Sequence, residues 1–228
     1  MRYVDCWPSL FPSRYTAGGA PAKFSKQSAA VTELYSRHLA AGDPIMSDTW
    51  WVRFSEPLDG LPAGFPCEPK LNAPGGFGLA AAILDLPDRR RRLATLDVVQ
   101  YHLMRMAASE GWATAPLEAA YRACVADDLV LHLVSKPKAS PDRRLKAFVA
   151  YTIDGNGDGR TTLHVEDRSG APVYEGEAWE SPCESDAFAQ IGRSLRWLGP
   201  RTVNVFTWPT VPPPKKDFQV EQTVELPS

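Results

Sequence analysis

The stretch that decides the fold of this chain is residues 145–167, LKAFVAYTIDGNGDGRTTLHVED. Apolar side chains stand on alternate positions of its first half: Leu145, Ala147, Val149, Tyr151 and Ile153. Alternation with a period of two predicts a strand with one buried face. The Asn-Gly and Asp-Gly dipeptides that follow favour a tight turn, and Leu163 and Val165 continue the buried face. The stretch therefore predicts an antiparallel hairpin.

Towards the C-terminus, the turn residues 167–170 and a strand over residues 172–178 extend this hairpin into a meander over residues 145–178. Before it, residues 129–134 are an apolar run of strand length. A helix is expected to begin at Ser185. Four apolar residues would share its face: Phe188, Ile191, Leu195 and Leu198.

Residues 202–207 predict one further strand, and residues 209–228 are expected to form a proline-rich polar tail.

The N-terminal half carries helical periodicity instead. Amphipathic spacing predicts a helix over residues 28–41 and a long helix over residues 88–110. Thr114 is placed to begin a third helix, with Pro116 in its first turn. Residues 49–54 alternate as a short strand. Between them, residues 57–78 contain so many prolines and glycines that a packed loop is expected.

Together these patterns predict an α+β fold: a helix-rich N-terminal half packed on a C-terminal antiparallel β-meander with one further helix and strand. One globular domain is expected over residues 1–208, with any subdivision falling near residues 57–88.

Composition excludes several classes of protein. The chain has 228 residues, is 44% hydrophobic and carries a net charge of -2, so nothing draws it as a whole to nucleic acid or to an anionic membrane. No apolar run is long enough to span a bilayer, and Pro8 and Pro12 interrupt any export signal. Its cysteines are widely separated: Cys6, Cys67, Cys124 and Cys183. Reduced thiols in a soluble cytoplasmic protein are expected.

Residues 154–159, DGNGDG, match the opening of a calcium-binding loop. The match ends there, because Val165 occupies position twelve, where such loops carry a bidentate glutamate. A glycine-rich hairpin explains the same residues, so no metal site is predicted.

The densest charge run is Arg89, Arg90, Arg91 and Arg92, in the first turn of the predicted long helix. Four cations there oppose the positive end of the helix dipole, which makes the cluster either a solvated helix edge or a surface for an acidic partner. A loop is predicted over residues 135–144, and five cations lie in it or just after it: Lys136, Lys138, Arg143, Arg144 and Lys146. A larger basic patch would form if the fold brought these cations together with residues 89–92. Trp50 and Trp51 are the other candidate binding residues, because aromatic and arginine side chains dominate protein interfaces.

No catalytic or cofactor motif is present, and none of the four histidines stands at a telling spacing from an acid or a nucleophile. The sequence therefore favours a non-catalytic cytoplasmic protein-binding module of the antitoxin or immunity type, which recognises an acidic protein rather than nucleic acid. The alternative is a small-molecule enzyme, a hydrolase or transferase, with its pocket under the loop of residues 57–78.

Overall fold

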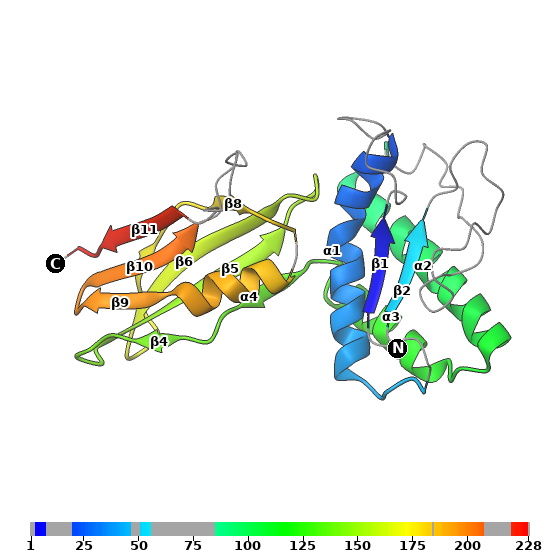
Figure 1. Ribbon diagram of the computed structural model, residues 1–228, viewed down its shortest axis with the longest axis horizontal. Helices are drawn as coiled ribbons and strands as arrows, with labels where there is room; N and C mark the ends of the chain where they lie inside the picture. Colours follow the sequence, from blue (N-terminus) through cyan, green and yellow to red (C-terminus); the bar gives the residue numbers. More distant parts are fainter. Residues whose placement is uncertain are drawn as a thin grey trace. The chain divides into compact units, whose positions relative to one another are not determined.

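The computed structural model describes residues 3–7, 20–46, 51–55, 85–183, 185–207 and 220–227 (Figure 1). Over these residues the fold is α+β, as predicted, with helices concentrated before residue 131 and antiparallel strands after it. The chain divides into two compact units. Unit 1 comprises Met1–Leu131 with Gly155–Gly157, and unit 2 comprises His132–Asp154 with Asp158–Ser228.

The boundary between the two units follows Leu131. The single domain expected over residues 1–208, with any subdivision near residues 57–88, stays a prediction.

Unit 1 is built from three helices and one pair of strands within the described residues (Figure 1). The helices are α1 (Ala20–Ala41), α2 (Asp88–Glu110) and α3 (Ala115–Ala126), and the strands are β1 (Tyr3–Trp7) and β2 (Trp51–Ser55). The two strands pair in parallel, with Tyr3 opposite Trp51. Because parallel neighbours need a long crossover, α1 serves as the connection between them.

Helix α2 has the predicted bounds, and Gly111 closes it in the left-handed conformation that favours glycine, at φ 69°. Helix α1 begins at Ala20, earlier than the predicted residue 28. Strand β1 was not predicted, because its parallel partner lies more than forty residues further along the chain.

Tyr35 joins the three helices of unit 1. Its ring is fully buried, and its hydroxyl donates to Gln100 Oε1 at 2.8 Å and to the carbonyl oxygen of Leu117 at 3.1 Å. Burial raises the pKa of this hydroxyl far above its ordinary value, so the phenol stays neutral. The surrounding core consists of apolar residues of the same three helices: Val31, Leu34, Leu39, Leu96, Val99, Leu103, Leu117 and Cys124.

Unit 2 is centred on a hairpin of β5 (Leu145–Ile153) and β6 (Gly159–Asp167), paired from Leu145 opposite Asp167 to Ile153 opposite Gly159. Strands β3 (His132–Val134) and β4 (Lys138–Ala139) extend the sheet beyond β5. Strands β7 (Pro172–Glu175) and β8 (Trp179–Ser181) extend it beyond β6. The predicted meander over residues 145–178 and its hairpin loop are therefore confirmed.

The remaining elements of unit 2 are α4 (Ser185–Ser194), β9 (Arg196–Gly199), β10 (Thr202–Thr207) and β11 (Val220–Glu225). Two predictions were wrong in this region. Helix α4 stops at Ser194, so Leu198 lies in a strand and is 57% exposed. The expected polar tail contains β11, which pairs antiparallel with β10.

Long-range contacts explain both differences. The Lys138 ammonium donates to the carbonyl oxygens of Arg193 and Leu195, at 2.7 and 2.6 Å, where α4 ends. On β11, Glu221 accepts hydrogen bonds from Arg196 and from the buried Asn204. Neither set of partners is visible in the local sequence.

The hairpin of β5 and β6 has an inner and an outer face. The inner side chains, among them Val149 and Tyr151, are fully buried, and Tyr151 stacks on Phe188 of α4 with ring centroids 5.1 Å apart. The outer side chains, among them Phe148 and His164, keep partial exposure. No described helix has the length and apolar character needed to cross a bilayer.

Candidate functional site

The predicted arginine cluster at the start of α2 is only half exposed. Arg89 and Arg90 are exposed, but the side chains of Arg91 and Arg92 retain 12% and 8% of their accessible surface. The expectation of a fully exposed cluster is therefore wrong for Arg91 and Arg92. Asp88 is the reason, since its carboxylate lies 2.9 Å from Arg91 Nη2 and 3.1 Å from Arg92 Nε. An acidic residue in the first turn also suits the positive end of the helix dipole.

The same segment holds the end of α3. Arg89 Nε donates to Asp128 Oδ1 at 2.7 Å, and Arg92 Nη1 donates to the Leu129 carbonyl oxygen at 3.0 Å. Asp128 and Leu129 have positive φ angles of 53° and 61°, a strained backbone for residues with side chains. These contacts fix that turn and place cations at the negative end of the α3 dipole.

His38 of α1 reaches this turn as well, with its Nε2 2.8 Å from Asp127 Oδ2. We call His38, Arg89, Arg92 and the turn Asp127, Asp128 and Leu129 the α3 clamp. The clamp gives a structural role to two of the four arginines that the sequence suggested for binding, Arg89 and Arg92. Arg90 remains exposed.

Of the two tryptophans suggested for binding, Trp51 is the first residue of β2, where it pairs with Tyr3. Trp50 lies outside the described residues. The loop of residues 57–78, proposed to cover a pocket, lies outside them too.

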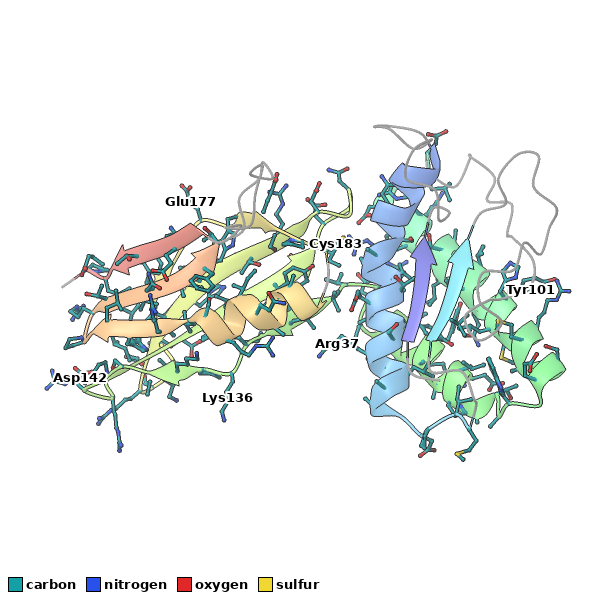
Figure 2. The ribbon with its side chains drawn as sticks, in the orientation of Figure 1. Arg37, Tyr101, Lys136, Asp142, Glu177 and Cys183 are labelled. Atoms are coloured by element: carbon teal, nitrogen blue, oxygen red, sulfur yellow. The ribbon has the colours of Figure 1, made fainter. Side chains whose placement is uncertain are left out.

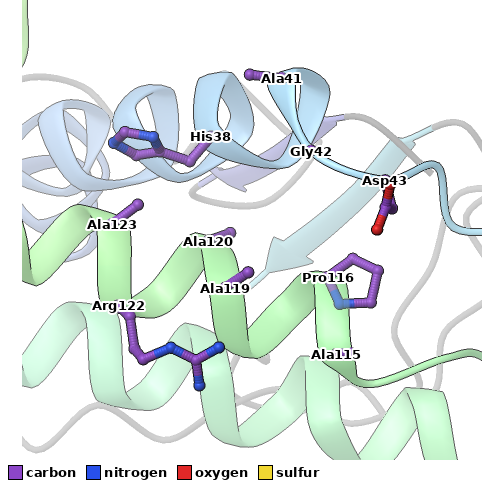
Figure 3. Close-up of a pocket in the computed structure, with 10 residues that line it drawn as sticks. All are labelled: His38, Ala41, Gly42, Asp43, Ala115, Pro116, Ala119, Ala120, Arg122 and Ala123. Atoms are coloured by element: carbon purple, nitrogen blue, oxygen red, sulfur yellow. The ribbon is translucent and has the colours of Figure 1, made fainter.

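A groove of about 630 Å³ runs between the end of α1 and α3 of unit 1 (Figure 3). Alanines form much of its wall, and Ala120 and Ala123 of α3 lie across from the end of α1. Its polar members are His38, Asp43 and Arg122. His38 is engaged by Asp127, so the groove combines an apolar wall with an imidazole oriented by a carboxylate.

A more strongly charged surface lies in unit 2, where β5 begins and β6 ends. The turn before β5 contains Ser140, which is buried and whose hydroxyl donates to Asp142 Oδ1 at 2.6 Å. That carboxylate also accepts the Arg144 backbone N–H at 3.1 Å. These hydrogen bonds, that of Ser140 foremost, hold the pKa of Asp142 below its ordinary value. The turn presents Arg143 and Arg144 to solvent.

The neighbouring turn, after β6, is built in the same way. Asp167 Oδ1 accepts the hydroxyl and backbone N–H of Ser169, at 2.6 and 2.8 Å, and the backbone N–H of Ala171 at 3.0 Å. The Ser169 hydroxyl contributes most to lowering the pKa of Asp167. Arg168 is exposed between these residues.

One hydrogen bond joins the two turns: Arg168 Nε donates to the carbonyl oxygen of Arg143 at 2.7 Å. We call residues 140–144 and 167–171 together the arginine turns. Figure 2 labels Asp142 at this end of unit 2, where nitrogen-tipped side chains extend outwards. Arg143, Arg144 and Lys146 are among the cations for which the sequence suggested a basic patch together with residues 89–92. Arg168 was missed because it lies 25 residues from Arg143 in the chain.

The outer face of the sheet continues from the arginine turns. Lys146 is exposed beside them, and further along the ring of Phe148 stacks on the imidazole of His164 at 5.3 Å. Val134, on β3, is 51% exposed. His164 Nδ1 lies 4.0 Å from Glu175 Oε2 at the edge of this face. The face thus has an aromatic centre, a basic end and acidic side chains at its edge.

No family model, curated protein or solved structure matches the chain. Cys124 is a buried thiol, as predicted, and burial raises its pKa to about 12, so it is not poised as a nucleophile.

The residues that match the opening of a calcium loop stabilise the hairpin turn instead. Asp154 Oδ1 accepts the Asp158 backbone N–H at 2.9 Å, and its Oδ2 lies 3.2 Å from Arg160 Nε. Among the described residues, no three His, Cys, Asp or Glu side chains are grouped as metal ligands.

Proposed function

We propose that this protein is a non-catalytic cytoplasmic module that binds an acidic protein, in the manner of an antitoxin or immunity protein. The observation that carries the proposal is the outer sheet face of unit 2, with the Phe148 and His164 stack at its centre and the arginine turns at its end. Aromatic and arginine side chains are enriched at protein interfaces and supply most of their binding energy.

The two faces of the sheet differ in a way that supports this proposal. The inner face is buried by α4 through Tyr151 and Phe188, so its apolar side chains are committed to the core. The outer face keeps Phe148 partly exposed and Val134 half-exposed. A partner that covered this patch would bury apolar surface at its centre and meet cations at its end.

Site-specific crosslinking tests the proposal. A photoreactive phenylalanine analogue at position 148 should yield one partner adduct in the native cell, and the same analogue at the exposed Tyr101 of unit 1 should not. The partner, purified, should bind the wild-type protein with 1:1 stoichiometry and bind Phe148→Ala at least tenfold more weakly. Equal adducts from both positions, or unchanged affinity of Phe148→Ala, would count against the proposal.

A second function is favoured by the groove of unit 1. An imidazole whose Nε2 is held by a carboxylate, as in His38 and Asp127, is the arrangement that orients a general base. A hydrolase using this groove would lose turnover in His38→Gln while remaining folded. Because the same pair belongs to the α3 clamp, activity that survives His38→Gln would leave only the structural role for His38.

A further inference from the structure

We infer that the arginine turns are a preorganised receptor for an acidic segment of the partner, in which Arg143, Arg144 and Arg168 bind its Asp or Glu carboxylates. This inference rests on the proposed function and names the chemistry of the partner. In this receptor Ser140, Asp142 and Asp167 are positioning residues, which hold the turns and do not touch the ligand.

The backbone of the first turn is held in a conformation that few residues adopt. Arg143 has a φ angle of 58°, which is unfavourable for a side chain with a Cβ atom. The conformation persists because the Arg143 N–H donates to the Ser140 carbonyl oxygen at 2.8 Å and its own carbonyl oxygen accepts Arg168 Nε. These two hydrogen bonds offset the backbone strain and hold the turn in one shape before any ligand arrives.

Ser140 anchors that shape to the sheet. Its hydroxyl donates to Asp142 and accepts the Leu145 N–H at 3.0 Å, and its own N–H donates to the Leu145 carbonyl oxygen at 2.9 Å. Only 2% of Ser140 is exposed, so water does not substitute easily for these bonds. Ser140 thus ties the turn to Leu145, the first residue of β5.

The aspartate carboxylates of the two turns accept hydrogen bonds from donors within the same turns. Asp142 accepts Ser140 and the Arg144 backbone, and Asp167 accepts Ser169 and Ala171. The remaining ion pair is long, with 3.8 Å between Arg144 Nε and Asp142 Oδ2. Arg143, Arg144 and Arg168 are exposed, and a planar guanidinium binds a carboxylate with two parallel hydrogen bonds.

The surroundings favour a protein partner over nucleic acid. Asp142 and Asp167 stand within the turns, and Glu166 is paired across the sheet from Lys146. These acids interrupt the positive charge along which a continuous phosphate backbone would bind, and the chain has a net charge of -2. Carboxylates spaced along a polypeptide could instead meet the arginines one by one.

The first experiment measures binding of a fluorescein-labelled peptide with four glutamates separated by glycines. The wild-type protein should bind it with an affinity that falls as salt is raised, because exposed charges are screened. Arg143→Gln with Arg144→Gln should weaken binding at least tenfold at low salt. The charge-matched control, Arg37→Gln with Arg105→Gln, removes two exposed cations of unit 1 and should bind as the wild type does.

The second experiment isolates preorganisation from charge. Ser140→Ala changes no charge, so it should weaken peptide binding several-fold while leaving the salt dependence of the affinity unchanged. Ser140→Thr keeps the hydroxyl and should restore the affinity. A Ser140→Ala protein that is folded and binds as tightly as the wild type would contradict the positioning role.

Three outcomes would overturn the inference: no peptide binding by the wild type, equal loss in the control pair, or tighter binding of a 20-base-pair DNA duplex than of the peptide at the same ionic strength. The proposed function fails separately. If capture of the partner depends on Phe148 but not on Arg143 and Arg144, the proposed function stands and only the arginine receptor is refuted.

Discussion

Arg92 Nη1 donates a hydrogen bond to the carbonyl oxygen of Leu129 at 3.0 Å, across 37 residues of sequence. The Arg92 guanidinium is also paired with Asp88, and its side chain is 8% exposed. A residue placed in a run of like charges thus joins the start of α2 to the strained turn after α3. Its role in stability differs from that of its exposed neighbour Arg90.

Replacing Arg92 with Ala should lower the free energy of unfolding by about 2–4 kcal/mol, because it leaves the Leu129 carbonyl oxygen without its charged donor and removes one of the two guanidinium partners of Asp88. Replacing Arg90 with Ala should change it by less than about 0.5 kcal/mol, as for most exposed positions. Urea denaturation of the two variants measures the difference. Equal free energies of unfolding for the two variants would show that Arg92 does not stabilise the α3 clamp.

Gly159 is required at the start of β6. A Cβ atom there would lie 2.5 Å from the Ser181 carbonyl oxygen and 2.6 Å from that of Pro182. We expect Gly159→Ala to destabilise the protein by about 1–3 kcal/mol through overpacking. Gly199→Ala is the control, since its nearest neighbour is Thr202 Oγ1 at 3.5 Å. The two variants should differ clearly in melting temperature. A Gly159→Ala protein as stable as Gly199→Ala would show that β8 moves to make room for the added methyl group.

The arginine turns should loosen in acid. Because hydrogen bonds lower the pKa of Asp142 and Asp167 in the folded protein, their stabilisation is present above the ordinary aspartate pKa and is lost as pH falls through the folded value. Titration of the carboxyl carbons by NMR should give midpoints below 3.8 for both groups. Ser140→Ala should raise the midpoint of Asp142 and leave that of Asp167 unchanged. A midpoint at or above 3.8 for both in the wild type would contradict this account.

Millimolar calcium should leave the melting temperature almost unchanged. The Asp154 carboxylate is already engaged by the Asp158 N–H and by Arg160, and Val165 is buried where a calcium loop would need a glutamate. A ligand that binds weakly stabilises little, in proportion to its occupancy. Differential scanning fluorimetry with calcium or chelator tests this. A rise of several degrees that disappears in Asp154→Ala would establish a metal site.

Local periodicity predicted the central hairpin and the bounds of α2 because their determinants lie within the elements. The alternation from Leu145 to Ile153 decides which side chains can be buried together, whatever lies opposite. Gly111 ends α2 through its own backbone conformation. Part of the candidate site was visible in the same way, since Arg143 and Arg144 stand in a predicted loop.

The sequence by itself therefore determined the α+β class, the meander and the long helix of this protein. Only the tertiary structure decided that Lys138 meets the end of α4, that β11 pairs with β10, and that Arg168 joins Arg143 while Arg92 turns inward. The physical reason is one of distance. Periodicity and turn propensity act within about ten residues of chain, whereas burial of a charge or the end of a helix depends on partners brought together from 25 to 57 residues away.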